Sequence, residues 1–195
     1  RLPIGNYKKN KIKVLNPRIK FNGKFWCVSL ALEVEDKADT GLTDESIGVD
    51  LGIKNLAIVS NIDKPFKNIN KSKEVKRLNK KLKRLQKQVS RKYDMLKSGN
   101  TFKKGEKLSK TKNIIKIKKQ IKIVHKKIAD IRLNHIHQTT NTIVKTKPCR
   151  VVVEDLNVKG LMKNKHLSKA ISEQCFNKFI AILEYKCKWS GIEWV

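Results

Sequence analysis

The spacing of hydrophobic positions changes along the chain and predicts where strands give way to helices. Up to about residue 60, apolar residues alternate with polar ones or form short runs, as in KIKVLNPRIKF, FWCVSLALEVE and SIGVDLGIKNLAIVSN. Such segments are typical of β-strands. Asn22-Gly23 separates the first two runs, which is a strong hairpin signal. Residues 52 to 55 separate two further strands, and the first of these carries Asp50.

From about Lys71 the apolar residues recur at spacings of three, four and seven, which predicts two long amphipathic helices. The first series is Val75, Leu78, Leu82, Leu85, Val89 and Leu96, and the second is Ile114, Ile117, Ile121, Val124, Ile128 and Ile131. The segment SGNTFKKGEKLS between them has the composition of a loop. We therefore expect the helices to pack as an antiparallel pair along their heptad seams.

The last part of the chain returns to a strand and then to a helix. CRVVVEDLNVKG predicts a buried strand that ends in two acids and a turn, and residues 166 to 189 resume helical spacing. GIEWV predicts the start of another strand. The chain opens on Arg1 rather than Met, so we expect both ends to be truncation points of a longer protein.

This order of elements predicts an α/β fold in two parts. Residues 1 to 44 form a partial β module, and the polar stretch from 36 to 45 is the natural linker. Residues 45 to 195 form a mixed sheet with a helical insertion over about residues 71 to 144. A sheet that lacks its last strands keeps an open edge that can pair with another chain, so the sequence does not fix the oligomeric state.

Charge narrows the class of partner. The chain has 46 Lys and Arg against 17 Asp and Glu, a formal net charge of +29. Between Lys71 and Lys127 there are 23 basic residues and three acids, Glu74, Asp94 and Glu106, which leaves a surplus of 20 on the predicted helical pair. Single-sign charge of this density favours nucleic-acid phosphates over an anionic membrane surface. No apolar run approaches the roughly 18 residues of a spanning helix.

The basic helices predict contact with the nucleic-acid backbone rather than base stacking, because aromatic residues are nearly absent from them. A solvated coiled coil is the alternative, although such surfaces usually mix both signs of charge. The expected contact residues are Lys54, Lys76, Arg77, Lys80, Arg84, Lys87, Arg91, Lys116, Lys119, Lys122, Lys126, Arg132, Asn157 and Lys159. For Asn157 and Lys159, formation of a turn after the strand is an equal alternative.

Two acids interrupt apolar strands and are the candidates for chemistry. Asp50 lies within IGVDLGI, and Glu154 follows RVVV. A buried carboxylate is costly unless a partner or a metal compensates it, so both positions need an explanation. Each acid alone could instead cap a turn. Together, at strand ends of an α/β sheet, they favour a divalent-metal site, with Mg²⁺ or Mn²⁺ as the ion. Alternation assigns Glu154 to the metal and leaves Asp155 to the turn.

Two motifs resemble one family. IGVDLGIKNLAIVS resembles the first RuvC motif, and RVVVEDLNVKGLMKN with LEYKCKW resembles the second RuvC region, of the TnpB (OrfB) transposon-encoded family, which is related to type V CRISPR effectors. The resemblance implies an RNase H-like (RuvC) fold preceded by the end of a wedge-like β-barrel. It also implies a metal-dependent, RNA-guided DNA endonuclease, with Asp50 and Glu154 as catalytic residues and guide RNA and DNA as partners.

The resemblance also defines what these residues lack. In the family a four-cysteine zinc ribbon and a third catalytic aspartate follow the second RuvC region, and both would lie beyond Val195. We therefore expect this chain alone to have little cleavage activity while it retains nucleic-acid binding. The alternative is an inactive nucleic-acid-binding product of a decayed element. A strand-joining transposase of related fold is disfavoured by the close match to the second RuvC region. A cytoplasmic location is expected, because no secretory signal is present.

Overall fold

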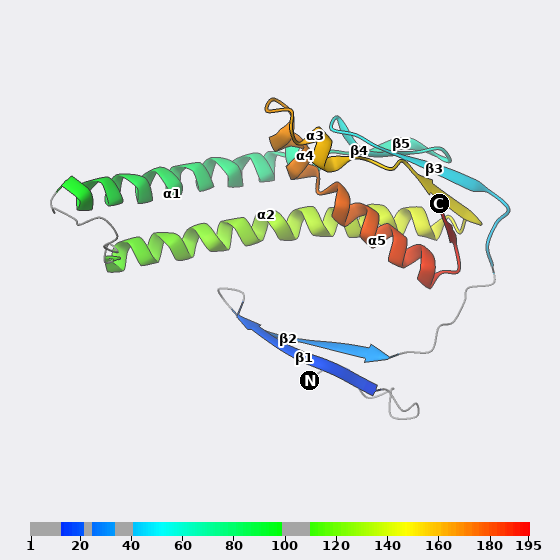
Figure 1. Ribbon diagram of the computed structural model, residues 1–195, viewed down its shortest axis with the longest axis horizontal. Coiled ribbons are helices and arrows are strands. Elements are labelled where there is room, and N and C mark those ends of the chain that lie inside the picture. Colours follow the sequence, from blue (N-terminus) through cyan, green and yellow to red (C-terminus); the bar gives the residue numbers. More distant parts are fainter. Residues whose placement is uncertain (1–12, 22–24, 34–40, 99–109) are drawn as a thin grey trace. The chain divides into compact units, whose positions relative to one another are not determined.

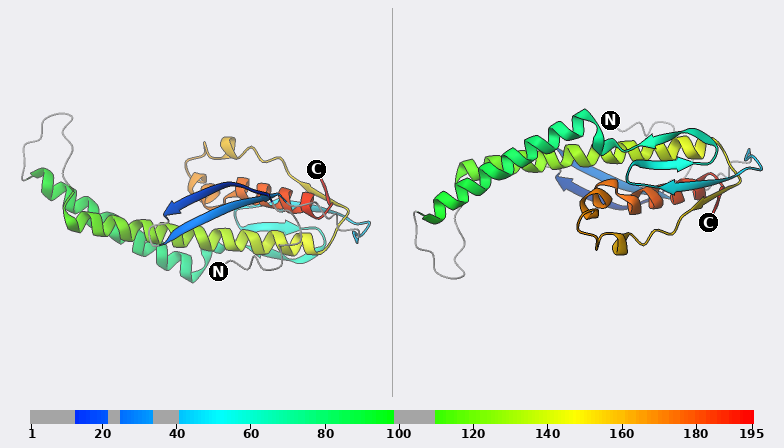
Figure 2. Two further views of the ribbon diagram at one scale, coloured as in Figure 1. Left: turned by 90° about the horizontal axis from the view of Figure 1, so that it is seen from below. Right: turned by 90° about the horizontal axis from the view of Figure 1, so that it is seen from above.

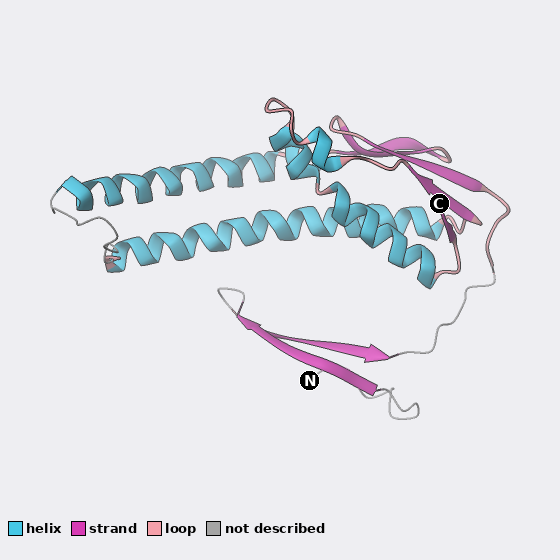
Figure 3. Cartoon of the chain, viewed as in Figure 1, coloured by secondary structure: helices cyan, strands magenta, loops and turns pink. Residues whose placement is uncertain are grey.

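The computed structural model describes residues 13–21, 25–33, 41–98 and 110–195. The chain divides into two compact units, Arg1–Lys37 and Ala38–Val195. The strands and helices of both units are shown by type in Figure 3.

The first unit is an antiparallel pair of strands, β1 (Lys13–Phe21) and β2 (Trp26–Glu33). Their pairing confirms the predicted hairpin, while Asn22-Gly23 itself lies outside the described residues. Phe21 is opposite Trp26, and their rings pack at a tilt of 46° with centroids 5.1 Å apart. Trp26 nevertheless keeps 73% of its surface exposed. A two-stranded hairpin offers no second layer in which to bury it.

The second unit is built on a five-stranded sheet with the order β5-β4-β3-β6-β7. Strands β3 (Ser46–Leu51), β4 (Asn55–Val59) and β5 (Ile62–Lys67) are antiparallel neighbours. Strand β6 (Arg150–Val153) runs parallel to β3, and β7 (Glu193–Trp194) runs parallel to β6. The predicted mixed α/β sheet is therefore confirmed.

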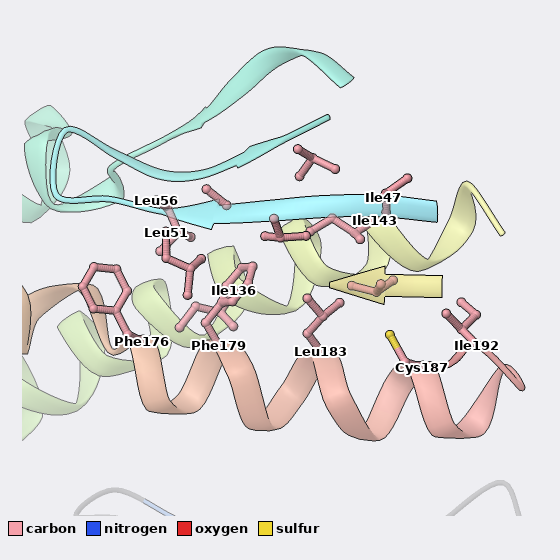
Figure 4. Close-up of a cluster of buried hydrophobic side chains, with 14 of the residues drawn as sticks. Ile47, Leu51, Leu56, Ile136, Ile143, Phe176, Phe179, Leu183, Cys187 and Ile192 are labelled. Atoms are coloured by element: carbon pink, nitrogen blue, oxygen red, sulfur yellow. The ribbon is translucent and has the colours of Figure 1, made fainter. Parts of the chain in front are cut away.

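Helices cover one face of this sheet. Alternation along β3 points Ile47, Val49 and Leu51 into the core, where they meet α2 (Lys112–Lys145) and α5 (Phe176–Trp189). Figure 4 shows the side chains of α5 rising toward β3. Cys187 belongs to this core, and burial raises the pKa of its thiol to about 11. The core thus fixes one face of β3 and leaves the other to carry polar groups.

The long helices form an arm that extends beyond the sheet. Helix α1 (Lys73–Ser98) packs antiparallel on the first half of α2, as predicted, and Figures 1 and 2 show the pair projecting from one end of the sheet. The arm has its own small core, with Val75, Leu78, Leu85, Val124 and Ile128 buried in it. Helix α2 continues without a break into the sheet core. No helix among the described residues is long and apolar enough to cross a membrane.

Two local features differ from the sequence prediction. Strand β5 was not expected, because IDKPFK is polar and contains Pro65; an edge strand tolerates a proline that an inner strand does not. The predicted last helix is divided into α4 (Ser168–Gln174) and α5 by Cys175, whose φ of 56° is left-handed. Trp189, at the end of α5, is 71% exposed and packs edge-on against Tyr185, with ring centroids 6.3 Å apart.

Candidate metal centre and nucleic-acid interface

Asp50 and Glu154 lie at the carboxyl ends of two adjoining parallel strands. Asp50 is the penultimate residue of β3, and Glu154 directly follows β6. The ladder pairs Val49 with Val153, so continuing the register by one residue brings Asp50 opposite Glu154. Alternation then places both on the face that carries Gly48 and Val152, opposite the helices.

Both carboxylates are exposed, which corrects the expectation that they are buried. The apolar letters around them describe the other face of each strand, where Val49 and Val151 are buried. On the carboxylate face Ile58 and Val152 keep 47% and 40% of their surface exposed. Alternation along a strand shows which residues share a face of the sheet, but it does not show whether one face or both are covered by other elements. The cost of burying a charge is therefore not a reason to expect a metal or a partner at Asp50 and Glu154.

The donor set suits a hard divalent cation. Among the described residues no ion pair occupies Asp50 or Glu154, so their oxygens face solvent unpaired. Carboxylate oxygens are the ligands that Mg²⁺ and Mn²⁺ prefer, with water filling the remaining positions. Within the described part of the chain, no cluster of three or more His, Cys, Asp or Glu is suited to a metal. Asp50 and Glu154 are therefore the two acids that follow the paired ends of β3 and β6.

A buried amide fixes the turn that follows Asp50. Gln174 of α4 is 3% exposed, and its Nε2 donates to the carbonyl oxygens of Gly52, Ile53 and Asn55 at 2.8, 3.2 and 3.4 Å. Asn68 adds a bond from its Nδ2 to the Ile53 oxygen at 2.9 Å. The end of β3 is therefore held from two sides. Sequence reasoning missed Gln174, because a single glutamine in a helical segment carries no signal of its partners.

The turn after Glu154 is capped by Asn157. Its Oδ1 accepts from the Gly160 backbone N–H at 2.9 Å and begins the short helix α3 (Val158–Leu161). Lys159 and Lys54 are exposed, and the Lys54 carbonyl accepts from Lys71 Nζ at 3.4 Å. In the structure Asn157 thus forms the turn, which is the alternative to its expected contact with nucleic acid.

Nearly all the basic residues expected to contact nucleic acid are exposed. On the arm they are Lys76, Arg77, Lys80, Arg84, Lys87, Arg91, Lys116, Lys119, Lys122 and Lys126. Lys126 is paired with Asp130 at 2.9 Å.

Arg132 is different, because its Nε donates to Asn70 Oδ1 at 2.7 Å and its Nη2 lies 3.4 Å from Glu173 Oε1. Asn70 also donates to the Glu173 backbone oxygen at 2.9 Å. Arg132 therefore joins the base of the arm to α4.

Three comparisons with known proteins place these features in context. A family model described as "Probable transposase" (OrfB_IS605) matches residues 29–165. A Streptomyces pristinaespiralis protein named "Putative RNA-guided DNA endonuclease" is 32% identical over 170 residues, which is 87% of this chain and 37% of that protein. One chain of a Cas12f1–sgRNA–target DNA complex aligns at 20% identity with a TM-score of 0.51, over 87% of this chain and 32% of that one. The chain spans about a third of the length of both relatives.

Proposed function

Because the chain belongs to the OrfB_IS605 family of transposases, we propose that it contributes part of a metal-dependent nuclease site and a nucleic-acid-binding arm to an RNA-guided DNA endonuclease. The observation that supports this proposal is the register of β3 and β6, which pairs Val49 with Val153; Asp50 and Glu154 are the exposed residues that follow them. The mixed sheet, with an antiparallel trio followed by parallel strands, is compatible with an RNase H-like fold.

In this proposal Asp50 and Glu154 hold one or two divalent cations, Mg²⁺ or Mn²⁺. A bound ion lowers the pKa of a coordinated water and neutralises charge on a phosphodiester. The chain's own contribution is to hold two carboxylates at the end of the sheet, where Gln174 fixes the turn that follows β3. Zinc is expected only in a ribbon of the type found in the family.

The proposed partners are a guide RNA and a DNA target. Two facts support them: the Streptomyces relative is named for RNA-guided DNA cleavage, and the Cas12f1 chain was solved with sgRNA and target DNA. On this chain the segment from residue 71 to residue 127, which contains the arm and has a surplus of 20 positive charges, is suited to their phosphates. Residues 1 to 44 are proposed to be the end of a wedge-like module, and residues 45 to 195 the partial nuclease domain.

The carboxylate site is tested by metal binding, which needs no cleavage. Mn²⁺ titration of the chain, followed by electron paramagnetic resonance, should show weaker binding in Asp50→Asn and in Glu154→Gln. We expect a loss of at least about tenfold, the size seen when even an outer partner of a metal ligand is removed. Asp155→Asn is the matched control, because Asp155 is an exposed neighbouring acid assigned to the turn. It should bind Mn²⁺ like the wild type.

Equal Mn²⁺ binding by Asp50→Asn and the wild type would show that the two acids are not a metal site. Labelled DNA with a few millimolar Mg²⁺ or Mn²⁺ completes the test. In an extended protein that includes this chain, Asp50→Ala should abolish cutting. An extended protein that binds DNA but never cuts it would favour the inactive nucleic-acid-binding alternative.

A further inference from the structure

The basic residues of the arm are not spread evenly around it. Three hollows of about 700, 530 and 500 Å³ lie along the arm, and Arg84 lines all of them; the first two are lined by both α1 and α2, and the third by α1 alone. Because their linings share further residues, they form one continuous groove from Arg77 to Arg91. We call this the arginine groove. Its lining residues are Arg77, Leu78, Lys80, Lys81, Lys83, Arg84, Leu85, Lys87, Gln88, Arg91, Gln120, Ile123, Val124 and Lys127.

The arginines of α1 repeat at an interval of seven residues. Arg77, Arg84 and Arg91 are the only arginines in α1, and all three line the groove. Seven residues are almost two helical turns, so the three side chains leave the same flank about 10.5 Å apart. Arginine binds a phosphate through two parallel hydrogen bonds, which lysine cannot do.

On the opposite flank of α1, the residues that repeat at the same interval are uncharged. Asn79, Gln86 and Tyr93 repeat every seven residues there. Tyr93 is also engaged, because its hydroxyl accepts from Lys118 Nζ of α2 at 2.6 Å. Sequence counting, which treated the arm as uniformly basic, could have detected the arginine interval but not the groove that it faces.

We infer that the arginine groove is the surface of the arm that binds nucleic acid, and that its occupant is the sugar–phosphate backbone of a double helix. This inference rests on the proposed function and narrows it. The row from Arg77 to Arg91 is about 21 Å long, a length over which a B-form duplex carries about a dozen phosphates. The groove has no aromatic lining residue among those described, whereas single-strand sites stack bases on aromatic side chains.

The residues on the floor and at the ends of the groove are suited to contact with a sugar–phosphate backbone. Ile123, 41% exposed, forms an apolar strip between the two helices, and Gln88 and Gln120 offer amides that can bond sugar or phosphate oxygens. Toward the sheet, Lys127 is paired with Glu74 at 3.3 Å, so its charge is partly used. Lys80, Lys81, Lys83 and Lys87 also line the groove, but only the arginines can hold a phosphate through paired hydrogen bonds.

The test compares two triple variants of the full chain that remove the same charge. Arg77→Gln, Arg84→Gln and Arg91→Gln together empty the groove of guanidinium groups. Lys73→Gln, Lys97→Gln and Lys112→Gln remove three exposed cations of the arm that line none of the three hollows. Binding of fluorescent duplex DNA, duplex RNA and a single strand of equal length is measured by anisotropy without divalent metal, over a range of salt concentrations.

Loss of three phosphate contacts should lower the slope of log affinity against log salt by about 2.7 on duplex DNA. The lysine variant should lower it by less than one. Replacing the three arginines by lysine should keep the wild-type slope while weakening binding, because the charge stays and the paired hydrogen bonds are lost. Circular dichroism at each step confirms that the helices are intact, and the two duplexes identify whether DNA or RNA is the better source of the backbone.

Equal slope changes in the two glutamine variants would overturn the arginine groove as the binding surface. So would tighter binding of the single strand than of either duplex, or a lysine replacement that fails to keep the slope. These outcomes leave the proposed function standing. If the wild-type chain binds no nucleic acid at physiological salt, both the arginine groove and the proposed nucleic-acid-binding function are contradicted. The Mn²⁺ titration tests the carboxylate site independently of this result.

Discussion

Gln174 is the residue on which the position of the β3–β4 turn depends most directly. Its amide supplies a donor to three backbone oxygens, and the side chain is buried. Replacing it with leucine keeps the volume but leaves these acceptors without that donor. An unsatisfied buried polar group costs about 1–3 kcal/mol, so Gln174→Leu should lower the free energy of unfolding by this amount in urea titrations.

Gln86→Leu is the control, because Gln86 is exposed on the arm and its replacement should stay within about 0.5 kcal/mol of the wild type. If both variants unfold at the same urea concentration, the Gln174 bonds do not stabilise the turn. Such a result would also weaken the case that the end of β3 is rigid beside Asp50.

At the scale of elements, the sequence predicted what periodicity can encode and missed what depends on neighbours. The two arm helices were predictable because their apolar residues repeat along a single seam. Strand β5 was not, since Pro65 and polar residues are acceptable only at a sheet edge, which is a fact of topology. Strand alternation put Asp50 on the face opposite Val49, but the exposure of Asp50 and Glu154 depended on which face of the sheet the helices cover.

Helix α2 links two cores that would otherwise be separate. Val124 and Ile128 are buried in the arm, whereas Ile136 and Ile143 are buried against the sheet. Asn134 lies between these sets and is exposed. Proline there removes a helical hydrogen bond and clashes with the preceding turn, at a cost of about 3 kcal/mol. We expect Asn134→Pro to separate thermal unfolding, followed by circular dichroism, into an early arm transition and a later sheet transition.

Asn134→Ala is the matched variant, and it should unfold like the wild type or at a slightly higher temperature because alanine is the better helix former. A single unchanged transition in Asn134→Pro would mean that the continuity of α2 does not couple the arm to the sheet.

For the whole molecule, the charge of +29 is a destabilising term that the fold carries until a polyanion neutralises it. Much of it lies on the arm, where α1 and α2 bring like charges of two helices close together. The few ion pairs there, such as Lys126 with Asp130, are exposed and contribute little. Salt shortens the range of this repulsion to about 10 Å at 0.1 M.

The melting temperature of the chain should therefore rise between 20 and 500 mM NaCl. If the arm unfolds as a unit of fewer than 100 residues, the rise should be about 4–8 °C for each kcal/mol of repulsion removed. The variant without Arg77, Arg84 and Arg91 should start from a higher melting temperature at low salt and gain less, because it has less charge to screen. A duplex added at constant low ionic strength should stabilise the wild type more than this variant, since binding to the folded state raises its stability by mass action. Differential scanning calorimetry measures all three effects, and a melting temperature that falls or stays level with salt would show that the arm's charges are not in mutual repulsion.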